Sequence, residues 1–86
     1  MTVSREIVLQ VLECVNRNAG TTLTLPADGD LSMAQFGMNS FNTLAFIIDL
    51  ERTFDMEVDE SALTDGSLSS IYRVAQYVVD RKGKAA

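Results

Sequence analysis

The chain has 86 residues, 47% apolar and 22% charged, which is the composition of one folded globular domain rather than of a disordered segment. Its 7 basic and 12 acidic residues give a net charge of −5, which disfavours nucleic acid and anionic membrane as partners. The absence of histidine excludes serine–histidine and cysteine–histidine mechanisms, and the single cysteine leaves no zinc site of the usual kind. An enzyme in its own right is therefore disfavoured, and we expect no metal site.

Cys14 is the sole cysteine, so no disulfide can form within the chain. The opening residues MTVSREIVLQ carry charges where a secretory signal needs an unbroken apolar segment. No apolar run approaches the length that crosses a bilayer, and no lipidation motif is visible. We therefore expect a cytoplasmic protein, and a monomer.

A first helix is predicted over residues 4–18, where apolar side chains recur at the spacing of one helix face: Ile7, Val8, Val11, Leu12 and Val15. Ser4 is the expected N-cap, and the stretch 18–20, ending in glycine, supplies a stop. Cys14 lies beside the apolar stripe, so it is either a small core residue, which we favour, or a reactive thiol.

Residues 20–38 have no sustained periodicity and contain glycines, a proline and the turn sequence DGD at 28–30, which together predict a long loop. Counted as a calcium-binding loop from Asp28, this stretch has Met33 in place of the glycine and Asn39 in place of the bidentate glutamate, so that interpretation fails. A loop of this length in a small domain needs anchoring. The candidate anchors are Leu23, Leu25, Leu31, Met33 and Phe36.

A second helix is predicted from residue 40 to about 53, followed by a short helical turn within 58–65. Ser69 or Ser70 then caps a last helix, which ends near Arg81 and Lys82 and directs Ile71, Val74, Ala75 and Val78 inward. We expect a single domain over residues 1–82 and a disordered tail over 83–86. The predicted fold class is all-α, a small antiparallel bundle of three main helices and one short helix, with a long loop between the first two helices.

The second helix has apolar side chains on two sides of the helical wheel, roughly 135° apart. The first side holds Thr43, Phe46, Ile47, Leu50 and Phe54, the second holds Phe41, Leu44 and Ile48 with Ala45 at its margin, and the polar remainder is Asn42, Asp49 and Thr53. The first side suits the core. Either the long loop or the last helix covers the second side, or a partner protein docks there with Glu51, Arg52 and Asp55 as a charged rim.

The nine residues FGMNSFNTL, at 36–44, lead into this helix. Asn39 and Ser40 are both favourable at a helix start, so either the serine caps the helix or the turn serves to present its hydroxyl. The sequence pattern alone leaves both interpretations open.

These residues resemble those of the acyl and peptidyl carrier proteins. The stretch LSMAQFGMNSFNTLAFIIDLERTFDMEVDE is similar to that family's signature region, in which Leu/Phe-Gly-x-Asp-Ser-Leu begins the second helix. LSSIYRVAQYV is similar to its last helix, which a hydroxyl pair usually introduces. The order and length of the other segments also agree, so the resemblance covers nearly the whole chain.

The resemblance implies that Ser40 is the attachment point of 4′-phosphopantetheine, transferred from coenzyme A by a phosphopantetheinyl transferase with magnesium. The arm's thiol would hold an acyl or aminoacyl group as a thioester. A loading enzyme and a downstream synthase or transferase would be the other partners. Gly37 is expected to permit close backbone approach, Asn39 to cap the helix beside Ser40, and the docking residues to be Phe41, Leu44, Ala45, Ile48, Glu51 and Arg52.

Several positions depart from the family pattern. Asn39 stands where the family usually has aspartate, which keeps a capping oxygen but loses the charge that helps the transferase reaction. Phe41 replaces the usual leucine, and Asn42, Ala45 and Arg52 stand where carriers of fatty-acid synthesis often have acids. We therefore expect a carrier of a specialised pathway, such as polyketide, nonribosomal peptide or aminoacyl-transfer biosynthesis.

Two alternatives accompany this expectation. Because the sequence ends soon after the last helix, we expect a free-standing protein, the alternative being a domain of a larger synthase. The second alternative is an unmodified carrier-like interaction domain, in which Ser40 only begins a helix.

Overall fold

Three α-helices and two short 3₁₀ turns form the computed structural model, which describes residues 3–26 and 29–85. The α-helices are α1 (Arg5–Ala19), α2 (Ser40–Phe54) and α3 (Ile71–Ala85), and the turns are η1 (Met33–Phe36) and η2 (Glu60–Leu63). Within these described ranges there is no strand, only an isolated bridge between Ser32 and Ser70. The predicted all-α class is confirmed, with η2 at the place of the expected short helix.

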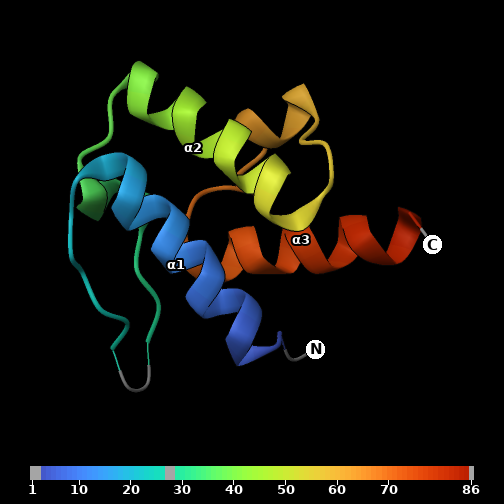
Figure 1. The fold of residues 1–86 in the computed structure, drawn as a ribbon, viewed down its shortest axis with the longest axis horizontal. Coiled ribbons are helices and arrows are strands. Elements are labelled where there is room, and N and C mark those ends of the chain that lie inside the picture. The colour runs from blue at the N-terminus through green and yellow to red at the C-terminus, as the bar shows by residue number, and fades with distance from the viewer. Residues whose placement is uncertain (1–2, 27–28, 86) are drawn as a thin grey trace.

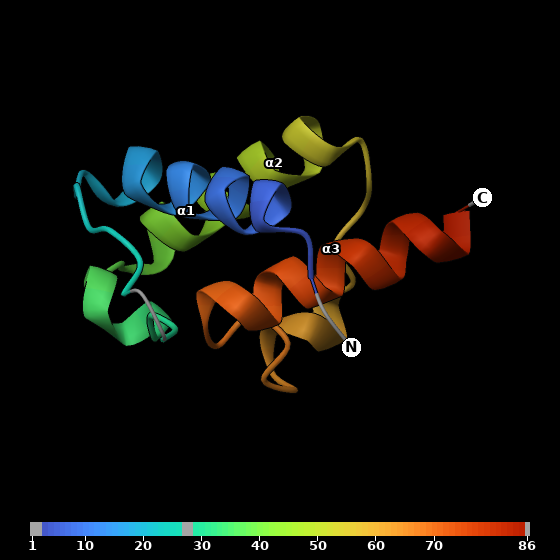
Figure 2. The ribbon, with the colours of Figure 1, turned by 90° about the horizontal axis from the view of Figure 1, so that it is seen from below.

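Helix α1 packs against both of the other helices (Figure 1). Figures 1 and 2 show that α1 runs opposite to α2 and to α3, which themselves run in the same general direction. The connection over residues 55–70, which contains η2, therefore carries the chain back along the bundle before α3 begins. The antiparallel relation holds for α1 with each of its neighbours.

One continuous core joins the three helices. Every residue expected to face inward from α3 is buried, as are Val8, Val11, Leu12 and Val15 of α1. Helix α2 contributes Phe46, Leu50 and Phe54, whereas Thr43 and Ile47, expected on the same side, are half-buried. Cys14 is 1% exposed and belongs to the same cluster, which confirms the prediction that it is a core residue.

The helix ends agree with the predicted positions, with two differences of detail. Ser4 precedes α1, but its side chain makes no capping hydrogen bond, and α1 stops at Gly20 in the left-handed conformation (φ 70°). Of the two serines expected as caps, Ser70 caps α3, because its hydroxyl accepts a hydrogen bond from the Arg73 N–H at 3.2 Å. Helix α3 continues to Ala85, so residues 83–85, expected in a disordered tail, are helical, while Ala86 lies outside the described residues.

The long loop is anchored to the start of α3. Leu31 and Phe36 are buried, and the Ile71 N–H donates to the Leu31 carbonyl at 2.9 Å. One carboxylate oxygen of Asp30 accepts the N–H groups of Leu31, at 2.8 Å, and of Tyr72, at 3.0 Å. Asp30 therefore caps α3 from a distant part of the chain, a role for the DGD sequence that its local pattern did not reveal; Asp28 of that sequence lies outside the described residues.

The same loop contains η1, which the sequence analysis placed in irregular structure. Its cap is reciprocal: the Ser32 hydroxyl accepts from the Ala34 N–H at 3.2 Å, and the Gln35 side chain accepts from the Ser32 N–H at 2.9 Å. The buried ring of Phe36 then holds the turn against the core. This short element determines where the chain enters α2.

We expect Asp30→Ala to lower the free energy of unfolding by about 1 kcal/mol, because the first turn of α3 loses a charged cap. Asp30→Asn keeps an acceptor oxygen and should lose less. Urea denaturation followed by circular dichroism measures both, with Glu57→Ala, an exposed acid in a loop, as the control. Equal stabilities of Asp30→Ala and the control would contradict the role of Asp30.

Candidate functional site

The turn that precedes α2 places Ser40 at the surface. Gly37 ends η1 in the left-handed conformation (φ 62°), and Asn39 is extended before α2 starts at Ser40. The expected close backbone approach at Gly37 is not part of the fold, because a Cβ atom there would meet no atom within 4 Å. Glycine is required at this position because φ is positive, a backbone conformation that residues with a side chain rarely adopt.

Asn39, and not Ser40, caps α2. The Asn39 Oδ1 accepts the Asn42 N–H at 2.9 Å, and the Asn42 Oδ1 accepts the Asn39 N–H at 3.3 Å. Ser40 is exposed in the first turn of the helix, and its hydroxyl makes no hydrogen bond to any described residue. Since the cap is complete without it, the Ser40 hydroxyl is available to other molecules.

Asn42 also ties this turn to α1, because its Nδ2 donates to the Asn18 carbonyl at 2.9 Å. Further along α2, Asp49 Oδ2 accepts from Arg17 at 2.7 Å and from Asn18 Nδ2 at 2.8 Å. The Thr53 hydroxyl lies 3.5 Å from the Cys14 sulfur. We call these six residues, three on each helix, the polar seam. The sequence analysis identified the three on α2 as polar but did not predict that they pair with α1.

The seam shifts the pKa of three ionisable groups, and the hydrogen bond to Asp49 raises that of Arg17. Partial burial raises the pKa of Asp49, but the hydrogen bonds from Arg17 and Asn18 outweigh it, so the pKa lies below its usual value. Burial raises the pKa of the Cys14 thiol, although the hydrogen bond with Thr53 opposes it. The thiol therefore stays protonated near neutral pH and is a poor nucleophile.

With the seam turned toward α1, the second apolar side of α2 points to solvent. Phe41 is 85% exposed, Leu44 59% and Ile48 43%, and Ala45 is exposed beside them. We call these four residues the outer face. No described part of the long loop or of α3 buries them, so that alternative is wrong for this structure. Phe41 lies directly next to Ser40 in the chain.

The residues predicted to form the charged rim differ in how accessible they are to a partner. Glu51 is half-buried, and its Oε2 accepts the Val58 N–H at 2.9 Å, which ties down the connection after α2. Arg52 is exposed, as is Asp55, which ends α2 in the left-handed conformation (φ 52°). Of the residues expected to form the rim, Glu51 thus has a role within the fold.

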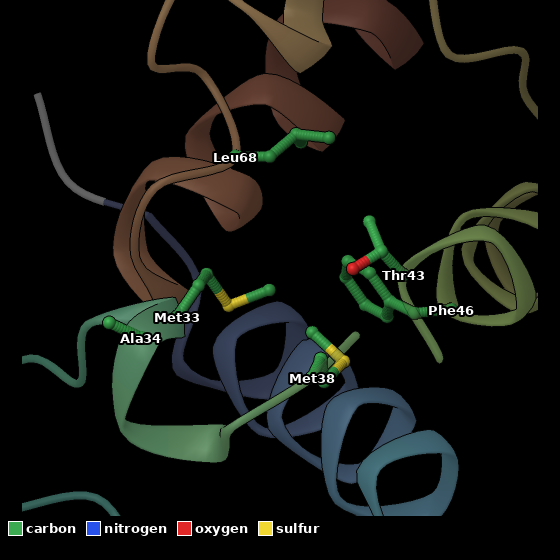
Figure 3. A pocket seen from close by; sticks show the side chains of 6 residues that line it. All are labelled: Met33, Ala34, Met38, Thr43, Phe46 and Leu68. Carbon is green, nitrogen blue, oxygen red and sulfur yellow. The ribbon is translucent and has the colours of Figure 1, made fainter. Parts of the chain in front are cut away.

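Two hollows flank the serine turn, and the sequence analysis anticipated neither. Figure 3 shows the first, of about 250 Å³, where Met33, Ala34, Met38, Thr43, Phe46 and Leu68 surround an apolar space. The second is an open groove of about 580 Å³ that begins at Ser40 and runs past Leu44 and Ile47 to Leu63 of η2. Neither lining contains a charged residue, so both suit apolar groups.

The described residues offer no activating group for Ser40. None of their carboxylates or amines forms a hydrogen bond to its hydroxyl, and nowhere in ranges 3–26 and 29–85 do three cysteines or acids gather as metal ligands. No described helix has the length and apolar character needed to cross a membrane. The serine is thus accessible, and no described group activates its hydroxyl.

A known family model matches most of the chain. The family model described as "phosphopantetheine attachment site" matches residues 5–78. This range includes the serine turn and the buried core residues of all three helices. No curated protein was similar enough to be matched.

Asn42→Ala should lower the free energy of unfolding by about 1 to 2 kcal/mol, because both the reciprocal cap of α2 and the bridge to Asn18 are lost. Asn39→Asp, which keeps the acceptor oxygen for the Asn42 N–H, is the matched control and should unfold like the wild type. Chemical denaturation measures both. If Asn42→Ala were as stable as the wild type, the bridge would have no structural role.

The polar seam should make stability depend on acidic pH. Because the pKa of Asp49 is lower in the folded protein than in the unfolded chain, its ionised form stabilises the fold above the unfolded value, near 4, and this contribution is lost as the pH falls through the folded value. The difference in unfolding free energy between wild type and Asp49→Asn should therefore shrink between about pH 6 and about pH 3.

Arg17→Gln removes the same ion pair from the other helix and should show the same dependence on pH. Urea denaturation at both pH values gives the comparison. If the difference in unfolding free energy between wild type and either variant stayed constant down to the lower pH, the ionised Asp49 would not contribute to stability.

Proposed function

This chain belongs to the phosphopantetheine attachment-site family, and we propose that it is a carrier protein in which Ser40 holds the 4′-phosphopantetheine arm that this family carries covalently. The arm supplies a terminal thiol to which an acyl or aminoacyl group is linked as a thioester. The carrier delivers that group to partner enzymes and catalyses no reaction itself. The exposed, uncapped hydroxyl of Ser40 is the observation that supports the assignment most directly.

The residues around Ser40 fit such an arm. The N–H groups of Ser40 and Phe41 make no hydrogen bond to the described residues, and they lie at the N-terminus of α2, where the helix dipole favours a phosphodiester. The groove that begins at Ser40 is lined mainly by apolar side chains, which suits the largely uncharged remainder of the arm. The neutral Asn39 adds no repulsion to the phosphate.

Attachment requires a phosphopantetheinyl transferase, because this chain has no base beside Ser40. The Ser40 oxygen forms a new bond to the phosphorus of coenzyme A that bears pantetheine. The pyrophosphate bond breaks, and 3′,5′-adenosine bisphosphate leaves with the bonding electrons. The proton of the serine passes to a base of the transferase, which also supplies magnesium.

The outer face of α2 is the proposed docking surface for the transferase, the loading enzyme and the downstream synthase or transferase. Its Phe41 and Leu44 are among the most exposed large apolar side chains of the described residues, and they lie within the first two turns after Ser40. The lack of acids at Asn42, Ala45 and Arg52 supports a role in a specialised pathway, of the polyketide, nonribosomal peptide or aminoacyl-transfer type, rather than in fatty-acid synthesis.

A second candidate is an unmodified domain that only binds other proteins. One observation favours it: Asn39 stands where the family usually has the aspartate that assists modification, and its side chain is committed to the cap. In that case Ser40 serves only as the first residue of α2, and Ser40→Ala leaves every partner interaction intact.

The deciding experiment is the intact mass of the protein before and after incubation with coenzyme A, magnesium and a broad-specificity transferase. We expect the wild type to gain the mass of one phosphopantetheine and Ser40→Ala to gain none. Asn39→Asp, which restores the family's usual acid and keeps the cap, should be modified at least as fast.

A folded wild type that gains no mass, together with an Asn39→Asp variant that does, would mean that a dedicated transferase is required. If neither protein is modified by any of several transferases, the carrier assignment fails and the interaction domain is favoured.

A further inference from the structure

The charges on α2 are distributed unevenly between the interior of the fold and its surface. The helix has three ionisable side chains, Asp49, Glu51 and Arg52. Asp49 is engaged by Arg17 and Asn18 of α1, and Glu51 accepts the Val58 N–H. Both acids of α2 thus have partners within the fold, which leaves Arg52 as the charge that this helix presents outward.

Arg52 lies on the same side of α2 as the outer face. Phe41, Leu44 and Ala45, Ile48 and Arg52 follow one another at intervals of three or four residues, which places them in one row along the helix. Arg52 is exposed, and it forms no ion pair with any described residue. At 1.5 Å per residue, Arg52 lies about 16 Å along the helix axis from Phe41.

The apolar surface of this row is wider than α2 alone. Leu63 of η2 is 53% exposed, and with Leu44 and Ile47 it lines the groove that begins at Ser40. The surface thus combines an apolar area next to the serine with the positive charge of Arg52 three turns away, and the exposed Asp55 follows Arg52 at the end of α2. A partner that matches it needs an apolar pocket and one acidic group at a fixed spacing.

We propose that the enzyme that modifies Ser40 receives Phe41 in an apolar pocket and places an acidic side chain against Arg52. This proposal rests on the proposed function. The net charge of −5 would suggest a partner with a basic surface, whereas the proposal gives the partner an acidic group at this position. The long, exposed Arg52 side chain then fixes the register of the enzyme along α2, while the apolar contact near Ser40 supplies most of the affinity.

A second copy of this chain fits the surface less well. In a two-fold pairing of two α2 helices in opposite directions, each Arg52 faces the N-terminal end of the other helix, which carries partial positive charge. The shared net charge of −5 adds repulsion between the copies. A pairing through this face would also cover Ser40 in both copies.

The experiment measures kcat/KM for modification of the full chain by a broad-specificity transferase with coenzyme A and magnesium. We expect Arg52→Glu to lower kcat/KM about tenfold through KM, and Arg52→Gln to lower it less. Phe41→Ala should lower it by a factor of about ten or more. Arg73→Glu, which reverses an exposed arginine on α3, is the matched control and should remain within about twofold of the wild type.

Binding of the Ser40→Ala protein to the same transferase, measured by calorimetry, separates recognition from chemistry and should show the same order of effects for variants made in that background. Circular dichroism checks that each variant is folded. Sedimentation of the wild type should show a monomer.

An unchanged or higher kcat/KM for Arg52→Glu would overturn the proposal, because that result is expected if the partner has a basic group, or no charged group, opposite Arg52. A dimer that Phe41→Ala dissociates would also overturn it and assign the face to a second copy. Failure of the wild type to gain mass with any transferase removes the proposed function and this inference together, whereas a modified wild type with unaffected variants removes this inference alone.

Discussion

The polar seam between α1 and α2 sets the rotation of α2 about its own axis. This helix has two apolar sides, and burial alone does not decide strongly between them, because Phe41, Leu44 and Ile48 are as apolar as Phe46, Ile47 and Leu50. The ion pair of Arg17 with Asp49 and the bond from Asn42 to the Asn18 carbonyl hold one polar edge of α2 against α1. With that edge held, Phe46 and Leu50 enter the core and the outer face is left in solvent.

The same rotation explains how two adjacent polar residues divide their roles at the start of the helix. Asn39 completes the cap with Asn42, and Asn42 is itself held by α1, so the direction in which the chain enters α2 is determined by contacts that do not involve Ser40. The serine hydroxyl remains at the surface and lines the open groove, which shares Met38 and Thr43 with the apolar hollow. A group attached there projects from a rigid helix start, beside the side chains that partners would contact.

The helices and most of the core follow from local sequence. Apolar periodicity predicted α1 and the start of α3 almost to the residue, although α3 continues past the expected end to Ala85, and it separated the two apolar sides of α2. The features that escaped prediction depend on contacts between distant residues: Asp30 caps a helix 42 positions away, and Arg17 pairs with Asp49 across 32 positions. No local pattern specifies such pairs, since many acids and arginines could satisfy them equally well.

Other features could have been read from the sequence but were missed. Ser32 and Gln35 have the spacing of a capping box, which indicates a helical turn inside the long loop. The positive φ of Gly37 at the end of η1 constrains that position within the fold, whereas the close approach of another molecule to its backbone stays a prediction. The first hollow arises where Met33 and Met38, from the connection between α1 and α2, meet Leu68 from the connection between α2 and α3, which sequence order does not show.

The proposed role of Ser40 and the outer face depends most on which side of α2 faces solvent, and this can be measured directly. Methyl resonances of the isotope-labelled protein, recorded with a soluble paramagnetic agent, report the exposure of each side chain. The structure predicts strong broadening at Leu44, Ile48 and Leu63 and protection at Leu50 and Ile71. Protection of Leu44 and Ile48 equal to that of Leu50 would contradict the account, because the face beside Ser40 would then be part of the interior.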